Sequence, residues 1–503
     1  MAIDSRLIPA DFTPVPSLDH APKIIVSSTL PDDVEVVGFA VGSDGKVPSA
    51  LGTTFDALNR AGFAGTPGQT LVLPRTEGPV FIAVGVGSDP AQTATSLRDA
   101  AAAFARAAAR YSALALDLGE AFALEPSVVG QMVTEGTLLA RYRFTELKPT
   151  TTDIPLASLT IVSEPGTIEQ VTAGAATGEV TSRAANLARD LANNPPGHLT
   201  ATRMGTVGLD IADDYGLKVE VFDKKQLIEL GCGGLLGVNA GSAEEPRMIK
   251  MVYTPEGTPT SHVALVGKGI MYDAGGISLK PSDSMHLLMK MDMAGAAAIM
   301  GAMTALKALG VTSKVSAWLM CTDNMPSGTA MGLGDVLTMR GGKTVEIKNT
   351  DAEGRLVMAD ALVLATEEHP DAIVDVATLT GSALQTLGTR VAAVFGNDQA
   401  LVDQAIAASQ STDEPIWQLP LEHRYRPQLN SAYADMSNMG GPFNVAITAA
   451  LFLNEFVDGI PWAHLDIAGT MQSDTDDSWR TAGATGFATR LLIELLTNFT
   501  PTK

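Results

Sequence analysis

The second half of the chain alternates short apolar runs with longer helical patterns, and no other feature constrains the fold as much. Strand-like apolar runs occur at residues 262–266, 314–320, 344–347, 372–377 and 463–467. Helix-like runs lie between them, as at residues 294–309 and 356–368. Strands that alternate with helices predict a mostly parallel sheet covered by helices. Ligands of such sheets bind beyond the carboxyl ends of the strands, so this edge is where we expect chemistry.

The N-terminal part of the chain shows a similar alternation on a smaller scale. Residues 34–41, 80–85 and 159–162 have the composition of strands, and the Ala-rich residues 96–114 have that of a helix. The pattern predicts an α/β domain over residues 1–165, in which no cluster of catalytic residue types stands out.

A firm helix stop separates the two parts. The helical pattern that begins at Ile168 ends at Asn193-Asn194-Pro195-Pro196-Gly197, because consecutive prolines and a glycine cannot continue a helix. The fold class that follows is α/β. An N-terminal α/β domain (residues 1–165) is joined by a connecting helix (166–196) to a larger C-terminal α/β catalytic domain with a mostly parallel central sheet (197–503).

Charge and cysteine content narrow the function classes. The 503 residues include 34 Lys and Arg against 56 Asp and Glu, a formal net charge of −22. So acidic a chain repels nucleic acid and anionic membranes, which argues against either as a partner. Only Cys232 and Cys321 occur, which excludes a disulfide framework and a Cys-rich zinc ribbon. The N-terminus lacks the layout of a secretory signal, so we expect a cytoplasmic protein.

Charged residues collect where the predicted strands end. The candidates are Lys268, Asp273, Lys280 and Asp292 after the first strand, and Asp351, Glu353 and Arg355 after the run at 344–347. If Asp351 and Glu353 are locally extended, their spacing puts both carboxylates on one face. We expect four acids, two lysines and an arginine to meet in one crevice.

Crowded carboxylates repel each other and resist desolvation, so they need cations between them. Four shared carboxylates suit two divalent metals better than one. A ligand set rich in oxygen, with no His or Cys at useful spacing, favours Mn or Mg, with Zn as an alternative. Lys268 could bind a metal as the neutral amine if a dication and burial lower its pKa, whereas Lys280 would stay protonated and polarise a carbonyl.

Each element also has a purely structural explanation. The lysines could lie on the surface, Asp273-Ala274-Gly275-Gly276 could be a turn, and Asp292 could cap the following helix. Asp351, Glu353 and Arg355 could form a solvated ion pair. Their joint placement at strand ends favours a functional site. No H-E-x-x-H or G-x-S-x-G motif occurs, and we expect His464 and Cys321 to be core residues.

The same stretches resemble a known family. Asn349-Thr350-Asp351-Ala352-Glu353-Gly354-Arg355-Leu356 is similar to the signature octapeptide of the cytosolic leucyl aminopeptidase family. Residues 266–269, 275–282, 324–328, 377–381 and 461–469 also resemble that family's motifs. The similarity covers essentially all of residues 170–503 in order, whereas residues 1–165 are similar only in length and α/β character.

The resemblance implies a metal-dependent exopeptidase that removes N-terminal residues, leucine-like or of broad type, from peptides with a free α-amine. A hydroxide bridging two divalent metals would be the nucleophile. One metal would be held by Lys268, Asp273, Asp292 and Glu353, and the other by Asp273, Asp351 and Glu353. Lys280 and Arg355 fall on the family's catalytic positions, with bicarbonate as a carboxylate-like partner of Arg355.

The resemblance also implies a homo-hexamer acting on peptide substrates. Met289, Thr378, Leu379 and Gly381 are candidates for the substrate side-chain pocket. Two alternative functions remain open: a two-metal phosphoesterase, which would use a similar acidic cage, and a non-enzymatic DNA-binding regulator, which would need a basic face.

Overall fold

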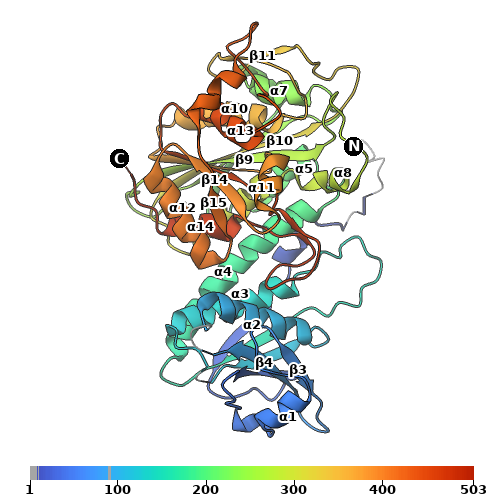
Figure 1. Cartoon of the computed structure of the whole chain (residues 1–503), viewed down its shortest axis with the longest axis vertical. Coiled ribbons are helices and arrows are strands. Elements are labelled where there is room, and N and C mark those ends of the chain that lie inside the picture. The colour runs from blue at the N-terminus through green and yellow to red at the C-terminus, as the bar shows by residue number, and fades with distance from the viewer. Residues whose placement is uncertain (1–7, 10, 89–91, 120, 503) are drawn as a thin grey trace. The chain divides into compact units, whose positions relative to one another are not determined.

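The computed structural model describes residues 8, 9, 11–88, 92–119 and 121–502. It divides into two compact units (Figure 1). The smaller unit contains Val15–Asn186 and Ser473–Gly483, and the larger contains Met1–Pro14, Leu187–Gln472 and Ala484–Lys503. Each unit combines helices with a mostly parallel sheet, so the predicted α/β fold class is confirmed.

A six-stranded sheet forms the centre of the smaller unit. Its order is β1-β6-β5-β2-β4-β3, and all neighbours pair in parallel except β3 with β4. The strands are β1 (Lys23–Ser27), β2 (Val36–Gly42), β3 (Thr70–Leu73), β4 (Val80–Gly87), β5 (Ala113–Asp117) and β6 (Ser158–Val162). One apolar core joins this sheet to α2 (Ala94–Ala107), α3 (Pro126–Arg141) and the start of α4 (Ile168–Asn193), and a second core involves α1 (Phe55–Arg60).

The helix predicted over residues 96–114 is too long at its C-terminal end. Helix α2 ends at Ala107, and Ala113 and Leu114 belong to β5, which lies between β2 and β6. Periodicity alone cannot separate a short buried strand from the apolar end of a helix, because both read as continuous apolar runs. The long helix α4 (Ile168–Asn193) stops where the two prolines follow. Among the described helices, none is long and apolar enough to cross a membrane.

The larger unit is built on an eight-stranded sheet. Its order is β15-β14-β17-β13-β9-β10-β8-β7, and the four central strands β17, β13, β9 and β10 are parallel. The strands are β7 (Leu217–Phe222), β8 (Arg247–Tyr253), β9 (His262–Asp273), β10 (Lys314–Asn324), β13 (Ala372–Ala377), β14 (Ala392–Gly396), β15 (Ile416–Gln418) and β17 (Trp462–Asp466). The central strands are buried on both faces, which explains their continuous apolar runs in the sequence.

Helices cover both faces of this sheet (Figure 1). Helices α9 (Ala294–Met303), α12 (Gln399–Thr412) and α14 (Thr489–Thr497) form one packed group, and α7 (Gly233–Asn239), α10 (Gly354–Thr366) and α13 (Val445–Asn454) form another. Helix α9 lies very close to the sheet, because a Cβ atom at Gly295 would collide with the backbone of Val376. A glycine at position 295 is therefore required for this close packing.

The strand predicted at residues 344–347 is not part of the main sheet. It forms β12 (Thr344–Glu346), which pairs with β11 (Val336–Thr338) and β16 (Met436–Ser437) in a separate three-stranded sheet. The order of strands and helices in the sequence grouped this run with the strands of the main sheet, which is wrong. A run of four residues is too short to specify the strand with which it pairs. The loop that follows β12 nevertheless reaches the carboxyl edge of the central strands.

Candidate active site

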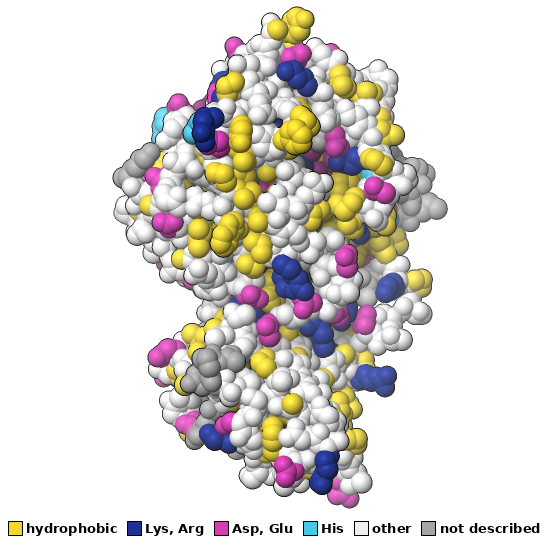
Figure 2. Space-filling view, in the orientation of Figure 1, with side chains coloured by type: hydrophobic (Ala, Val, Ile, Leu, Met, Phe, Trp, Pro, Cys, Tyr) yellow, Lys and Arg dark blue, Asp and Glu magenta, His cyan; other side chains and the backbone are white. Residues whose placement is uncertain are grey.

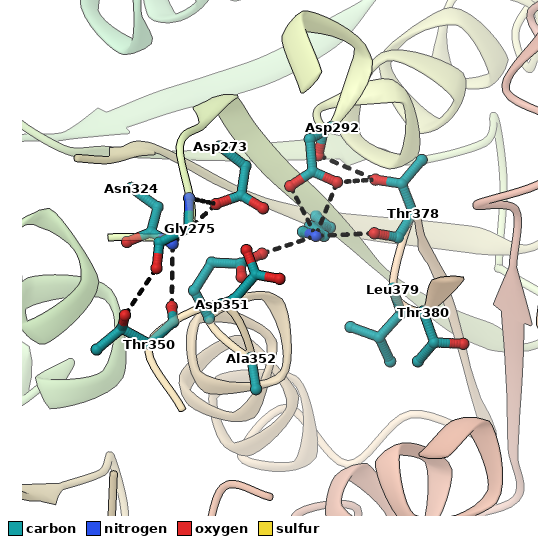
Figure 3. A network of polar contacts seen from close by, with 12 residues as sticks. Asp273, Gly275, Asp292, Asn324, Thr350, Asp351, Ala352, Thr378, Leu379 and Thr380 are labelled. Atoms are coloured by element: carbon teal, nitrogen blue, oxygen red, sulfur yellow. Dashed lines mark hydrogen bonds and ion pairs between the residues drawn. The ribbon is translucent and has the colours of Figure 1, made fainter. Parts of the chain in front are cut away.

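The predicted site residues meet at the carboxyl ends of the central strands (Figure 3). Lys268 and Asp273 lie on β9, and Asp292 lies just before α9. Asp351 and Glu353 lie immediately before α10, with Glu353 as its N-cap residue. Each of the four carboxylates among them takes part in an ion pair, either with Lys268 or with Lys280. The structure therefore brings the candidate metal ligands together in two groups, each organised around one lysine.

Lys268 is the centre of the first group. Its Nζ lies 2.8 Å from an Asp292 carboxylate oxygen and 2.8 Å from Glu353 Oε1. It also donates a hydrogen bond of 2.8 Å to the carbonyl oxygen of Thr378, the first residue after β13. The side chain is only 3% exposed. Lys268 therefore links three segments of the chain, and the alternative of a surface lysine is wrong for it.

Lys280 is the centre of the second group. Its Nζ lies 2.8 Å from Asp273 Oδ2 and 2.7 Å from Asp351 Oδ1. The side chain is 19% exposed, so this group faces solvent more than the first. Asp273 is itself oriented through its other oxygen, Oδ1, which accepts hydrogen bonds from the Gly275 amide and from Asn324 Nδ2.

Asn324 is an orienting residue whose role the sequence did not indicate. The parallel register pairs Asn324 at the end of β10 with Asp273 at the end of β9. Its Nδ2 donates to Asp273 Oδ1 at 2.8 Å and to the carbonyl oxygen of Thr350 at 3.0 Å (Figure 3). The available signals were its position after a predicted strand and its place in the 324–328 stretch that resembles a family motif. Asn324 thus joins β9 to the loop that carries Asp351.

Burial and like charges shift the pKa values of the acids. Burial raises the pKa of Asp292 well above its usual range, against the opposing effect of Lys268. Burial also raises the pKa of Asp351 to about 6, with help from Asp273. Burial disfavours the charged form of Lys268, yet the adjacent carboxylates outweigh it and raise the pKa of the ammonium. The two lysines offset only part of the charge of the four carboxylates in this cage.

Asp351 and Glu353 do not share a face as an extended segment would. Glu353 has helical backbone angles, φ −80° and ψ −38°, and Asp351 lies in a turn. Their carboxylates consequently contact different lysines, Glu353 with Lys268 and Asp351 with Lys280. The alternation of an extended strand is lost here because the chain is already entering α10. Both acids still belong to one cage.

Arg355 is buried and held by a residue that the sequence did not single out. Its Nη1 donates a hydrogen bond of 2.8 Å to the carbonyl oxygen of Asn438. The Asn438 side chain in turn donates to the carbonyl oxygens of Asn349 and Ala352 and accepts from the amide of Lys348. Burial lowers the pKa of Arg355 to about 10, although Glu353 opposes this shift. The solvated ion pair considered for Arg355 is therefore wrong.

Other structural alternatives are also resolved. The N-cap residue of α9 is Met293, so Asp292 does not cap that helix. His464 is a buried core residue, as predicted, and its Nδ1 lies 2.5 Å from Asp375 Oδ1. Cys321 is buried as predicted, and burial raises the pKa of its thiol to about 12. The Asp273 turn exists, because Asp273 accepts from the Gly275 amide, but the same carboxylate also binds Lys280.

The four candidate pocket residues differ in their relation to the cage. Thr378 is buried, and its Oγ1 donates to Asp292 Oδ1 at 2.8 Å (Figure 3). Leu379 follows in the same loop and is half-buried, as is Met289. Gly381 is exposed at the start of α11 (Gly381–Leu387). Among the described contacts, only Thr378 of these four is joined directly to the charged residues.

The donor set fits divalent metal ions. Asp273, Asp292 and Glu353 are all buried, and each offers an oxygen such that the three atoms lie within 4.8 Å of one another. Carboxylate oxygens suit hard divalent cations such as Mn²⁺ and Mg²⁺. Asp351 and the Lys268 amine lie beside this group and would complete a larger ligand set.

Comparisons with known proteins agree with this geometry. The family model for the catalytic domain of the cytosol aminopeptidase family matches residues 186–493, and that for the N-terminal domain of the same family matches residues 43–151. The second match goes beyond the sequence motifs, which gave residues 1–165 only a likeness in length and α/β character.

Individual relatives cover nearly the whole chain. A probable cytosol aminopeptidase of Streptomyces avermitilis is 42% identical and covers 90% of each chain. One from Alkaliphilus metalliredigens is 40% identical over 88% of this chain and 90% of its own. A solved structure of the bottromycin maturation enzyme BotP in complex with Mn is similar with a TM-score of 0.85 and 39% identity, over 92% of this chain and 99% of that one. The chain therefore belongs to the cytosol aminopeptidase family of metal-dependent peptidases.

Proposed function

We propose that this chain removes the N-terminal residue, leucine-like or of broad type, from peptides with a free α-amine, using two divalent metal ions. Family membership supports the aminopeptidase activity. The observation that carries the two-metal proposal is the buried cage itself. Asp273, Asp292, Asp351 and Glu353 come together around Lys268 and Lys280, so that four carboxylates face two ammonium groups.

We infer the ligand assignment from the family motifs. Lys268, Asp273, Asp292 and Glu353 would hold one ion, and Asp273, Asp351 and Glu353 the other. When bound, such ions supply a nucleophilic hydroxide at neutral pH and Lewis-acid polarisation of the peptide carbonyl. Mn²⁺ or Zn²⁺ would fill the sites, with Mg²⁺ as a third candidate, and the Mn complex of BotP is consistent with the first.

Lys280 is suited to stabilise charge on the peptide carbonyl oxygen. It is part of the cage yet more exposed than Lys268, so a substrate can reach its ammonium. Burial works against its charged form, but Asp273 and the other carboxylates raise its pKa, so the side chain stays protonated at neutral pH. A fixed cation beside the carbonyl oxygen stabilises the negative charge that develops in the transition state.

Arg355 is suited to hold an anion that moves the proton. Its guanidinium is buried and tied at Nη1 to Asn438, while its Nε makes no hydrogen bond within the described structure. A small carboxylate-like anion such as bicarbonate would satisfy the remaining donors in a planar, bidentate way. Such an anion could take a proton from water and deliver it to the leaving amine.

The substrate amine would be anchored by Asp292. This carboxylate is fixed by Lys268 and by the Thr378 hydroxyl, so it presents a defined position to a charged or metal-bound amine. Anchoring of the free amine explains why an exopeptidase would refuse peptides with a blocked N-terminus. Thr378, Leu379, Met289 and Gly381 remain the proposed surroundings of the first side chain.

The rival functions have less support. A phosphoesterase would use a similar cage, but the family models and relatives are peptidases. A DNA-binding role needs a basic surface. On the face drawn in Figure 2, Lys and Arg side chains lie scattered among Asp and Glu side chains, and the net charge is −22. Comparison of an aminoacyl anilide with a phosphate ester, and a salt-dependent gel shift, would separate the three functions.

Assembly and location follow from the family as further proposals. We expect a homo-hexamer in the cytoplasm, because the sequence resembles a hexameric family and the relatives are named cytosol aminopeptidases. Light scattering should give six times the 52.3 kDa mass of the chain, and a monomer or dimer would contradict this.

The central experiment combines metal removal with two substrates. Strong chelation should abolish hydrolysis of leucine p-nitroanilide, and Mn²⁺ should restore it, while an N-acetylated peptide should not be cleaved in either state. Lys280→Ala should collapse turnover with the metal content unchanged, and Lys46→Ala, a solvent-exposed lysine of the smaller unit, provides the control. Activity that survives chelation, or equal cleavage of the acetylated peptide, would refute the proposal.

A further inference from the structure

Asp466 is a buried carboxylate outside the predicted set of site residues. It ends β17, where the parallel register places it opposite Ala377, the last residue of β13. Its side chain is almost fully buried, and no basic side chain is paired with it in the described hydrogen bonds or ion pairs. Burying a carboxylate in this way is costly unless hydrogen bonds compensate.

Hydrogen bonds from the loop after β13 supply that compensation. Asp466 Oδ1 accepts from the amides of Leu379 at 3.1 Å and Thr380 at 3.3 Å, and Oδ2 accepts from the Thr380 hydroxyl at 2.7 Å. The amide of Ala468 adds a further bond of 3.2 Å to Oδ1. Asp466 thus determines where residues 379 and 380 lie.

The residue before these two touches the candidate metal ligands. Thr378 accepts a hydrogen bond from Lys268 Nζ through its carbonyl oxygen, and its Oγ1 donates to both the Oδ1 and the carbonyl oxygen of Asp292. In Figure 3, Thr378 faces Asp292, and Leu379 and Thr380 continue from it along the same loop. Asp466 is therefore linked to the Lys268–Asp292 pair through its hydrogen bonds to residues 379 and 380, the adjoining backbone, and the hydrogen bonds of Thr378.

We propose that Asp466 is a positioning residue that holds the 378–380 loop in the place where Thr378 orients Lys268 and Asp292. The proposal rests on the metal-dependent function proposed above, and it assigns Asp466 no contact with substrate or metal. Outer groups that orient metal ligands matter because a ligand that is free to rotate must be ordered on each binding event. The same loop carries Leu379 of the proposed pocket, so Asp466 would position that side chain as well.

The test measures Mn²⁺ affinity by titration of the chelator-stripped full chain, a readout independent of turnover. Asp466→Ala removes both acceptor oxygens and with them all four hydrogen bonds, and we expect about 10- to 100-fold weaker Mn²⁺ binding. Asp466→Asn keeps the Oδ1 acceptor, and its amide can donate to the Thr380 hydroxyl, so this variant should restore most of the affinity. Asp360→Ala is the matched control. Asp360 is also a buried carboxylate that accepts backbone amides, but its partners are Leu235 and Arg340.

A double-mutant cycle tests whether Asp466 acts through Thr378. Thr378→Val removes the hydroxyl that donates to Asp292, and its effect on Mn²⁺ affinity should be much smaller in the Asp466→Ala background than in the parent. Additive effects, or unchanged affinity in Asp466→Ala, would overturn the positioning role. If Asp466→Ala does not fold, Thr380→Val can be tested instead. This variant removes the hydrogen bond from the Thr380 hydroxyl to Asp466 and should also weaken Mn²⁺ binding. A parent chain that binds no Mn²⁺ would instead refute the proposed function.

Discussion

Gly354 should not tolerate a side chain, because Lys268 occupies the space where that side chain would be. A Cβ atom at position 354 would lie 2.6 Å from Lys268 Cε and 2.8 Å from Nζ. Ordinary contact begins at 3.4 Å, so Lys268 would have to move by about 0.8 Å in a close-packed interior. It cannot do so without leaving Asp292, Glu353 and the Thr378 carbonyl oxygen, each within 2.9 Å of Nζ.

The expected effect of Gly354→Ala follows from that displacement. A misplacement of about 1 Å in a catalytic group typically costs about 100-fold in rate, or about 2.7 kcal/mol of transition-state stabilisation. The backbone itself favours the change, because Gly354 begins α10 and alanine is the better helix former. Loss of activity with an unchanged or raised melting temperature would therefore indicate displacement of Lys268 rather than unfolding.

The assay is kcat/KM for leucine p-nitroanilide at saturating Mn²⁺, together with the metal content of the purified protein. Gly166→Ala is the matched control, because a Cβ atom at Gly166 meets nothing within 4 Å. If Gly354→Ala retained activity within about threefold of the parent with full metal content, Lys268 would have to be free to shift, and the reasoning about the cage would be wrong.

Three further predictions concern the residues around the site. Asn324→Ala should weaken Mn²⁺ binding about 10- to 100-fold in a metal titration, because Asp273 loses an orienting donor, and unchanged affinity would remove this role. Asp375→Ala should lower the free energy of unfolding, measured by urea titration, by about 3–5 kcal/mol, because the buried His464 loses its charged partner. A decrease below about 1 kcal/mol would contradict this prediction. Gly295→Ala should lower the melting temperature, because its Cβ would meet the backbone of β13, whereas Gly166→Ala should leave it unchanged.

The sequence predicts the residue types of the site better than their partners. The central strands are buried on both faces, so their apolar runs can be recognised, and the charged residues that follow them must lie at one edge. That reasoning places Asp273 correctly at the end of β9. Lys268, which was expected after a strand at residues 262–266, lies within β9 because that strand continues to Asp273. It cannot predict that Lys268 pairs with Glu353 while Lys280 pairs with Asp351. These pairings depend on where the loop between β12 and α10 lies in three dimensions, and β12 belongs to a different sheet.

The supporting residues are harder to predict because they act over long sequence separations. Asn438 holds Arg355 from 83 residues away, and Asp466 holds Thr380 from 86 residues away. Asn438 is an isolated Asn in a loop, and no periodicity or motif marks it, because turns use Asn often. Asp466 lies in the 461–469 stretch that resembles a family motif, but the motif does not say which residues Asp466 supports. Only the three-dimensional register, such as the pairing of Ala377 with Asp466, reveals what such a residue supports.

The two lysines of the cage differ in a way that separates their roles. Lys268 lies on a strand with a side chain 3% exposed, and a backbone carbonyl oxygen fixes it in addition to two carboxylates. Lys280 lies in a loop with a side chain 19% exposed, and its side-chain partners among the described contacts are both carboxylates. A group held from three directions in a closed space can orient neighbouring ligands but cannot follow a substrate. A group with an open side can meet a carbonyl oxygen that arrives from solvent. The geometry therefore favours Lys268 as part of the ligand cage and Lys280 as the residue that contacts the substrate.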